Sequence, residues 1–348
     1  MSPQRRHAHD AWKVQGSFGL PSLTRGTVES RALAPQEARM RVHATSLNYR
    51  DFLMVTGAYN PKQPLPLVPC SDGAGEIVEV GSAVTTLRVG DRVVANFAPE
   101  WTAGRPEVAK IRTTLGGPVD GLLQGQFVYG AHAFVRIPDH LSYEEAACFP
   151  CAALTAWSAL EQAGVTSGDT VLVQGTGGVS LFALQLAKLR GARVLASSKS
   201  AEKRTRVAAL GADATFDYVA EPKWSKEVRR PTEKRGVDCV IEVGGGTLGE
   251  SIASTRPGGT IALIGVLAGT STETLLTPVL MQNLRIQGVL VGHREQLEAL
   301  FRAAAQAQLR PVIDTVFPFA EAPAAFARMA AGAHFGKIVI AGAAEVGP

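Results

Sequence analysis

Apolar and polar positions alternate along the first part of the chain, in short stretches that glycine and proline interrupt. Ala38–Ala44 alternates as a half-buried strand does, and Gly73–Gly81 follows the same pattern with a glycine at each end. Leu87–Val94 carries a Gly-Asp turn between apolar strands, and Gln126–Pro138 predicts a further strand pair. No long helix is predicted before Tyr143. This part of the chain therefore predicts an irregular β-barrel or sandwich.

The pattern changes near Tyr143, where helical periodicity begins to alternate with short apolar blocks. Helices are predicted at residues 144–151, 154–162, 180–189, 201–210, 223–230 and 248–255. Strands are predicted at residues 171–174, 193–196, 214–217, 237–242, 260–264 and 285–291. Alternation at this spacing is typical of a parallel sheet wound on both faces by helices.

The chain after Gly292 predicts a last group of elements, which carries no phosphate-binding signature. Helices are expected at residues 295–307 and 322–331, and strands at residues 312–319 and 337–341. We assign this group to the first domain. The predicted domains are therefore residues 1–152 with 292–348, and residues 153–291.

A glycine turn within the wound domain is the clearest candidate for a binding site. The apolar run Val171–Val173 leads into Gly175, Thr176, Gly177, Gly178 and Val179, and a helical pattern follows. A strand, a glycine turn and a helix start together bind pyrophosphate, because free N–H groups point outward and glycine permits close approach. Glycines alone also suit an ordinary turn, so the flanking strand and helix carry the prediction.

Composition narrows the classes of function. The 348 residues carry a net charge of +4 with acids and bases interleaved, which gives no support for nucleic-acid binding. No apolar run approaches the length of a membrane span, and Met1–Asp10 lacks the apolar segment of a secretory signal. The four cysteines fit a reducing compartment, so we expect a cytoplasmic protein. Cys148 and Cys151 have C-x-x-C spacing, but no second pair completes a zinc site, which favours buried structural thiols.

Several motifs, taken in order, resemble the medium-chain dehydrogenase/reductases from about residue 12 onward. The resemblance implies a Rossmann doubly wound parallel sheet, a GroES-like β-barrel catalytic domain, a nicotinamide cofactor and hydride transfer. Within the family the chain most resembles the zinc-independent quinone oxidoreductase and enone reductase branch. The motifs that carry the resemblance are Ser46–Asp51, Asp72–Gly81, Val89–Val93, Pro150–Trp157, the glycine turn and Arg256–Thr260.

The resemblance also bears on a metal. In zinc-containing members, the ligand cysteine falls where this chain has Asn48, and the histidine-glutamate pair falls on Ser71 and Asp72. Only Cys151 keeps a ligand thiol. A catalytic zinc needs three protein ligands of N, S or carboxylate type, so we expect no metal. The four-cysteine structural zinc lobe is also missing, because Asn96–Gln124 contains no cysteine.

The choice of cofactor depends on the residues that follow the second strand of the wound sheet. A carboxylate there would favour NAD, but this chain has Ser198, followed by Lys199 and Lys203. Hydroxyl and cationic donors suit a 2′-phosphate, which favours NADP(H). A solvated helix start would also explain the lysines, although not the missing acid. By resemblance, Tyr218 and Lys337 are further cofactor-binding candidates.

The nicotinamide end of the cofactor is placed by resemblance alone. The residues expected to face the ring or its carboxamide are Thr155, Val243, Gly244, Ile264, Gly265, Leu290 and Val291. The glycines at 244–246 would let the backbone pass close to the cofactor, although a flexible turn is an equal alternative.

Without zinc, another group must stabilise the developing oxyanion and supply a proton. The candidates are Asn48, Tyr49 and Tyr59, where Tyr59 matches one of two active-site tyrosines of quinone reductases and Leu53 occupies the other position. Asp51 is expected to be a buried structural acid. We expect hydride transfer from NADPH to a quinone or to an α,β-unsaturated ketone or aldehyde. The alternatives are an NADP-dependent alcohol dehydrogenase or carbonyl reductase, and a non-catalytic NADPH-binding protein.

Two further expectations concern the surface. The turn-rich segment Asn96–Gln124 is expected to be a surface loop over the site, which would select the substrate. Arg285–Val291 ends the wound sheet and would present an unpaired edge strand, from which we expect a homodimer.

Overall fold

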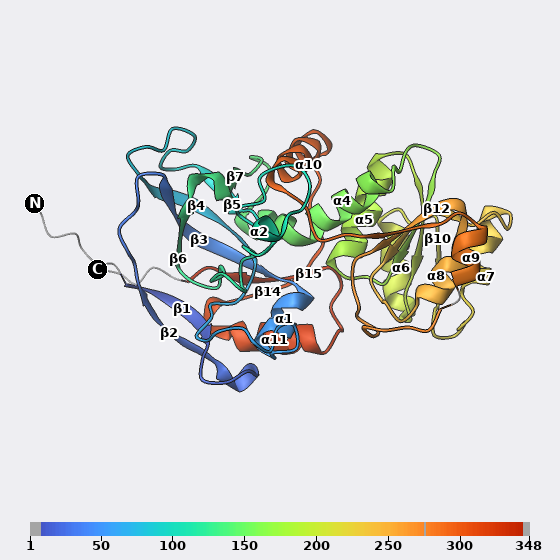
Figure 1. The fold of residues 1–348 in the computed structure, drawn as a ribbon, viewed down its shortest axis with the longest axis horizontal. Helices are drawn as coiled ribbons and strands as arrows, with labels where there is room; N and C mark the ends of the chain where they lie inside the picture. Colours follow the sequence, from blue (N-terminus) through green and yellow to red (C-terminus); the bar gives the residue numbers. More distant parts are fainter. Residues whose placement is uncertain (1–7, 275, 344–348) are drawn as a thin grey trace, which may run out of the picture. The chain divides into compact units, whose positions relative to one another are not determined.

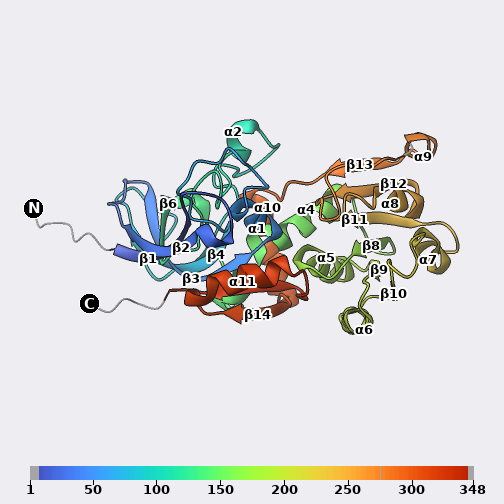
Figure 2. The same ribbon diagram turned by 90° about the horizontal axis from the view of Figure 1, so that it is seen from below.

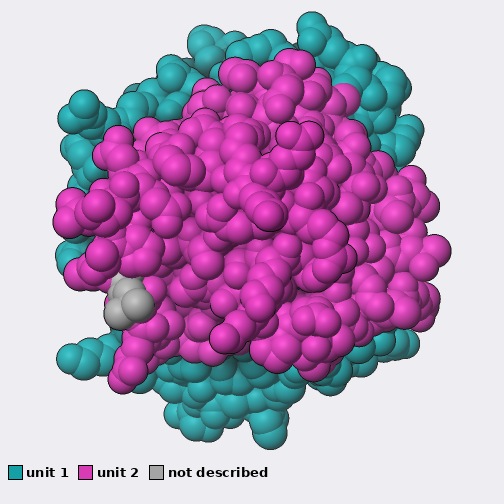
Figure 3. All heavy atoms as spheres, turned by 90° about the vertical axis from the view of Figure 1, so that its right-hand side faces the viewer, with its two compact units in different colours: residues 1–151, 292–348 teal, residues 152–291 magenta. Residues whose placement is uncertain are grey.

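A computed structural model describes residues 8–274 and 276–343. The chain forms two compact units, which Figure 3 draws in different colours. Unit 1 comprises the chain up to Cys151 and the return segment that begins at Gly292. Unit 2 comprises Ala152–Val291.

Unit 2, coloured from green to orange in Figure 1, is built on a six-stranded parallel sheet with strand order β10-β9-β8-β11-β12-β13 (Figure 2). The strands are β8 (Thr170–Gln174), β9 (Arg193–Ser197), β10 (Ala214–Phe216), β11 (Val237–Glu242), β12 (Thr255–Leu263) and β13 (Arg285–Gly288). The helices are α4 (Leu154–Gln162), α5 (Gly178–Leu189), α6 (Ala201–Ala209), α7 (Ser225–Arg229), α8 (Leu248–Ser254) and α9 (Leu276–Met281).

The wound α/β sheet predicted from the sequence is therefore confirmed. Helix α5 packs against β8 and β9, while α8 packs against β11 and β12 (Figure 2). Every residue of β8 and β11 is buried, which explains why the middle of each strand, Val171–Val173 and Cys239–Ile241, is apolar without alternation. Most boundaries lie within two residues of those predicted, but two differ more. β12 begins at Thr255 rather than at residue 260, and β13 ends at Gly288 rather than at residue 291.

Unit 1 contains a seven-stranded mixed sheet and a separate pair of strands. The path β14-β15-β3-β4-β5-β7 is antiparallel except between β14 and β15, and β6 also pairs with β3. The strands are β1 (Ala8–Val14), β2 (Leu23–Glu29), β3 (Glu37–Leu47), β4 (Asp72–Val80), β5 (Arg92–Ala95), β6 (Gln126–Gly130), β7 (Phe134–Arg136), β14 (Ile313–Phe317) and β15 (Lys337–Ala341).

The helices of unit 1 are short apart from α10. They are α1 (Tyr49–Val55), α2 (Val108–Ile111), α3 (Tyr143–Ala146), α10 (Arg294–Ala307) and α11 (Ala322–Ala330). The continuous helix predicted over residues 144–151 is wrong, because α3 ends at Ala146 and a π-helical turn covers Phe149–Ala153. Pro150 lies in that turn and has no backbone N–H with which to continue a regular helix.

The segment Asn96–Gln124 is only partly the surface loop predicted. Its middle part is exposed around α2, but Phe97, Trp101 and Leu115 are buried. Leu122 is also buried, in one apolar cluster with Met40. The ends of this segment therefore belong to the core of unit 1.

Among the helices of residues 8–274 and 276–343, none is long and apolar enough to cross a membrane.

Candidate functional site

The glycine turn of unit 2 begins where β8 ends. Gly175 has a positive φ of 71°, which favours glycine, and Gly177 caps the start of α5. A Cβ added at Gly175 or Gly177 would meet no atom within 4 Å, so the space in front of both residues is open. The turn therefore combines open backbone with the first N–H groups of a helix, as a pyrophosphate requires.

Ser180 stands where many such turns have a third glycine. Its hydroxyl donates to the Gln174 carbonyl at 2.6 Å, and the side chain is buried. The hydrogen bond ties the first turn of α5 back to the end of β8. A small hydroxyl thus replaces the close backbone contact that glycine would allow.

The candidates for a 2′-phosphate lie where β9 ends and α6 begins. Ser198 follows β9 directly, is buried, and accepts a hydrogen bond from the Ser200 N–H at 3.3 Å. Lys199 is exposed and Lys203 is half-buried. Arg204, by contrast, pairs with Asp217 at 2.8 Å. Arg204 therefore already has a carboxylate partner, and Lys199 is the most exposed of the three cationic side chains.

Tyr218 lies just after Asp217 and packs against the apolar core of unit 2. Its ring is half-buried, so one edge of it stays accessible beside the segment that carries Ser198. The segments that carry Ser198 and Tyr218 are held together by the backbone, because the Ser198 N–H donates to the Phe216 carbonyl at 3.1 Å. The structure thus brings Tyr218 and Ser198 to neighbouring strand ends.

A second turn follows β11, and it packs closely on the turn after β12. The Ala268 N–H donates to the Gly244 carbonyl at 2.7 Å. A Cβ on Gly245 would lie 2.6 Å from the Gly269 oxygen, and one on Gly265 would lie 2.7 Å from the Val243 oxygen. These glycines are therefore needed for contact between the two turns. That the backbone here also passes close to the cofactor stays a prediction.

The remaining nicotinamide-side candidates occupy different environments. Val243 and Ile264 are partly exposed at the ends of β11 and β12, whereas Thr155 is buried within α4. Leu290 is exposed, and Val291 is buried with a positive φ of 46°, an uncommon conformation for a β-branched residue. The cofactor contacts assigned to these residues stay predictions.

In unit 1, Asn48 caps the start of α1 and lies among buried polar side chains. We call Asn48 and these neighbours, Asp51, Ser71, Asp72 and Lys337, the Asn48 cluster. The Asn48 N–H donates to the Asp51 carboxylate at 2.8 Å, and the Ser71 N–H donates to the same carboxylate at 3.2 Å. Asp51 is completely buried. It joins α1 to the segment before β4, which is the structural role expected for it.

Lys337 is the residue whose position the sequence least anticipated. It begins β15 and is only 3% exposed. Its ammonium donates to the Leu47 carbonyl at 2.7 Å and to Asn48 Oδ1 at 2.6 Å. Because an ammonium can only donate, the Asn48 amide must turn its oxygen toward Lys337 and its NH₂ group toward Ser71, whose Oγ lies 3.4 Å away. A direct role of Lys337 toward the cofactor stays a prediction.

The side chains at the zinc-ligand positions are close together but do not suit zinc. The Ser71 hydroxyl donates to Asp72 at 2.9 Å, and the Cys151 N–H donates to the same carboxylate at 3.1 Å. Burial raises the pKa of Asp72 to about 6, against the opposing effect of Lys337, and burial also raises the pKa of the Cys151 thiol. Amide and hydroxyl groups are weak zinc ligands, so Asn48 and Ser71 leave only Asp72 and Cys151 as suitable donors at these positions. Within the described part of the chain, no three His, Cys, Asp or Glu side chains gather as a metal site would require.

Tyr49 and Tyr59 are the exposed aromatic residues beside Asn48, at 39% and 48% exposure. The Arg50 guanidinium lies 5.2 Å from the centre of the Tyr59 ring and donates to the Leu115 and Gly117 carbonyls at 2.8 and 2.9 Å. Arg50 therefore fixes the 96–124 segment and Tyr59 together. Its contact with the neighbouring Asp51 carboxylate is longer, at 3.5 Å.

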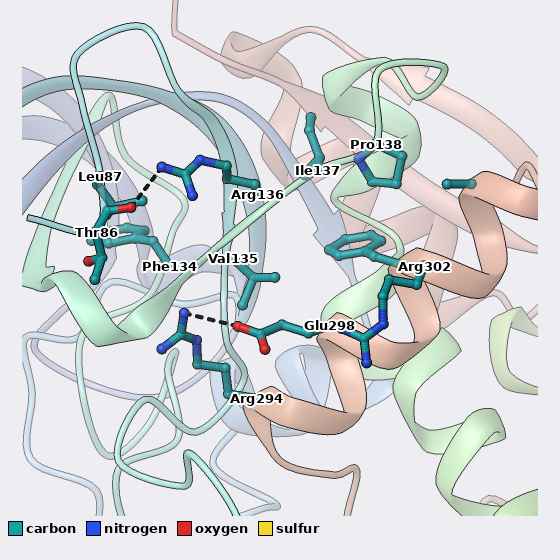
Figure 4. A pocket seen from close by; sticks show the side chains of 12 residues that line it. Thr86, Leu87, Phe134, Val135, Arg136, Ile137, Pro138, Arg294, Glu298 and Arg302 are labelled. Atoms are coloured by element: carbon teal, nitrogen blue, oxygen red, sulfur yellow. Dashed lines mark hydrogen bonds and ion pairs between the residues drawn. The ribbon is translucent and has the colours of Figure 1, made fainter.

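A separate groove of about 670 Å³ lies in unit 1 between β7 and α10 (Figure 4). None of the predicted site residues lines it. Arg294 pairs with Glu298 across one side, and Arg136 donates to the Thr86 carbonyl on the other. The groove is thus distinct from both the Asn48 cluster and the glycine turns.

Comparisons with known proteins agree with this architecture. The alcohol dehydrogenase GroES-like domain family matches residues 34–139, and the zinc-binding dehydrogenase family matches residues 178–306. A zinc-type alcohol dehydrogenase-like protein of Schizosaccharomyces pombe is 40% identical over 88% of this chain and 91% of its own length. The acryloyl-coenzyme A reductase of Metallosphaera sedula is 32% identical over 80% of this chain and 84% of its own. The solved structure of an NAD-dependent alcohol dehydrogenase, 33% identical, has a TM-score of 0.87 and covers 96% of this chain and all of its own.

These matches confirm the GroES-like domain and extend over nearly the whole chain. The names of these relatives are those of dehydrogenases and a reductase, and one of them is NAD-dependent. The chain therefore belongs to the medium-chain dehydrogenase/reductase superfamily, and it is an oxidoreductase of that NAD(P)-dependent type.

Proposed function

We propose that this protein is a zinc-independent, NADPH-dependent reductase of an α,β-unsaturated carbonyl compound or a quinone. The observation that carries the proposal is the Asn48 amide, which stands at a zinc-ligand position and is fixed by Lys337. Its NH₂ group can donate to a carbonyl oxygen where zinc members would place a cation. NADPH, when bound, would supply the hydride.

The protein's own contribution would be to polarise the carbonyl and to exclude water. Asn48 offers an amide N–H donor beside buried polar groups. Tyr49 begins α1, Tyr59 follows its C-terminal end, and both phenol side chains are exposed. An enone needs only a hydrogen-bond donor at its oxygen while its β-carbon accepts hydride. Oxidation of an alcohol would require a base beside the hydroxyl, and the nearest carboxylates, Asp51 and Asp72, are completely buried.

The relatives support more than one substrate class. The acryloyl-coenzyme A reductase acts, by its name, on a compound whose double bond is conjugated to a carbonyl. The alcohol dehydrogenases among the relatives favour the alternative of carbonyl reduction and alcohol oxidation. Zinc at stoichiometric content after dialysis, with alcohol oxidation, would establish that alternative.

The decisive experiment measures NADPH oxidation with a panel of enones, enals, quinones and saturated aldehydes, with metal analysis of the same sample. We expect turnover with conjugated substrates and less than one zinc per chain. Asn48→Ala should lower turnover by about 10²-fold or more if the amide donates to the oxyanion. Asn60→Ala, a change of the same side chain outside the Asn48 cluster, is the matched control. Tight NADPH binding with no turnover on any substrate would instead indicate a binding protein.

The preference for NADP(H) is supported by Ser198, Lys199 and Lys203, although the solved relative is NAD-dependent. Lys203→Glu places a carboxylate beside the expected 2′-phosphate, so it should raise the dissociation constant of NADPH much more than that of NADH. Lys226→Glu makes the same charge change on α7 and should affect neither. Equal effects of Lys203→Glu on both cofactors would contradict the assignment.

A further inference from the structure

The two glycine turns of unit 2 are joined by a buried polar pair. Gln174 is the last residue of β8 and Glu242 is the last residue of β11, and these strands are parallel neighbours, with Val173 beside Ile241. Both side chains are buried, Glu242 completely. The Gln174 amide donates to the Glu242 carboxylate at 2.9 Å.

Glu242 organises the turn that follows it. One carboxylate oxygen accepts from the Gly244 N–H at 2.8 Å, the Gly245 N–H at 3.0 Å and the Thr247 hydroxyl at 2.8 Å. The other accepts from Gln174 and from the Ser251 hydroxyl. The carboxylate thus receives five donors, and no cation pairs with it among the ion pairs of the described residues.

Gln174 connects the same network to the first turn. Its side-chain oxygen accepts from the Val243 N–H at 3.4 Å, and its amide also donates to the Ser251 hydroxyl at 2.7 Å. Its backbone carbonyl accepts from Ser180, and Gly175 follows directly. One or two hydrogen bonds, made through the Gln174 side chain, therefore connect the turn after β8 with the turn after β11.

We propose that Gln174 and Glu242 are positioning residues, which hold the two turns at the spacing that one dinucleotide needs. The inference rests on the proposed cofactor site, because the first turn would take the pyrophosphate and the second the nicotinamide end. These two side chains would not contact the cofactor themselves. By setting the distance between the turns, they would determine how well the pyrophosphate and the nicotinamide end bind at the same time.

The number of donors explains why a carboxylate is needed. An ionised carboxylate only accepts hydrogen bonds, whereas a glutamine amide offers one acceptor oxygen and turns an NH₂ group toward the remaining donors. Glu242→Gln can keep its oxygen toward Gly244, Gly245 and Thr247, but its NH₂ group then faces the Gln174 amide and the Ser251 hydroxyl, which are donors themselves. The hydrogen bond that joins the two turns should therefore be lost, while each turn keeps its own bonds.

The test compares the affinity for the whole cofactor with that for one half of it. We measure binding of NADPH and of adenosine 2′,5′-bisphosphate by calorimetry for wild type, Glu242→Gln, and the swap Gln174→Glu/Glu242→Gln. Glu242→Gln should raise the NADPH dissociation constant by about tenfold or more and change that of the bisphosphate by less than about threefold. The swap restores one carboxylate to the pair and should recover much of the affinity. Glu221→Gln, a surface change in the same unit, should have no effect.

Equal weakening of both ligands by Glu242→Gln, or unchanged NADPH binding, would overturn the positioning role. Amide hydrogen exchange tests it without any cofactor, since Glu242→Gln should speed exchange at Val243, whose N–H donates to the Gln174 side chain, and leave exchange at Gly175 and Leu181 unchanged. Unchanged exchange at Val243 would also overturn it. A wild-type protein that binds neither NADPH nor NADH would overturn the proposed function instead, and the exchange result would still decide the network.

Discussion

Asp72 should make the stability of unit 1 depend on pH in an unusual direction. Its carboxyl is completely buried beneath Asn48, and burial raises its pKa to about 6, from an ordinary value of 3.8. The folded protein therefore holds this proton more tightly than the unfolded chain does. The resulting stability is fully present below pH 3.8 and is lost as the pH rises through about 6.

The size of the effect follows from the same two values. A displacement from 3.8 to about 6 corresponds to about 3 kcal/mol of unfolding free energy, since one pKa unit is worth about 1.4 kcal/mol. Asp72→Asn keeps the shape of the neutral acid and cannot ionise. Relative to wild type, this variant should therefore gain about 3 kcal/mol between pH 4 and pH 8. Other titrating groups, such as Glu37, act in both proteins and cancel in the difference.

Urea titrations at a series of pH values would measure this difference. Replacing Trp157 and Trp224 with phenylalanine in every variant leaves Trp12 and Trp101, both buried in unit 1, as the fluorescent probes. Asp139→Asn, at an exposed position, is the control and should follow wild type. If the difference between wild type and Asp72→Asn does not change with pH, the Asp72 carboxyl is not destabilised by burial and the reasoning is wrong.

Three further predictions concern the turns, the Asn48 cluster and assembly. Gly245→Ala should lower the free energy of urea unfolding by about 1–3 kcal/mol, because the residue has a positive φ and a Cβ there would lie 2.6 Å from the Gly269 oxygen. Gly249→Ala should cost much less, since a Cβ at Gly249 would meet no atom within 4 Å. Equal losses in the two variants would contradict the packing argument. Lys337→Met removes a positive charge that lowers the pKa of Asp72, so that pKa, followed by the pH dependence of unfolding, should rise above its wild-type value. Light scattering at micromolar concentration should give the mass of a homodimer, because Ile286 on the edge strand β13 and Leu280 on α9 are exposed; a monomer mass would exclude this.

The order of elements could be read from the sequence because apolar spacing reflects local geometry. The short apolar runs Val171–Val173 and Cys239–Ile241 predicted β8 and β11, and helical spacing predicted α4 with the ends it has in the structure. The glycine turn was recognisable for the same reason, since a strand, a tight turn and a helix are consecutive in the chain. The lack of ligand side chains at two of the zinc-ligand positions could also be read from the sequence, because Asn48 and Ser71 carry an amide and a hydroxyl in any fold.

The sequence by itself therefore determined the wound sheet, the position of the glycine turn after β8, and the chemical character of the residues at the zinc-ligand positions. Only the tertiary structure decided which polar groups meet. Lys337 reaches Asn48 across 289 positions of sequence, and Gln174 reaches Glu242 across 68. Such contacts leave no periodic signal, because they depend on the pairing of distant strands, here β15 with β3 and β11 with β8. Burial then makes each contact consequential, since a polar group removed from water must find its partner within the fold.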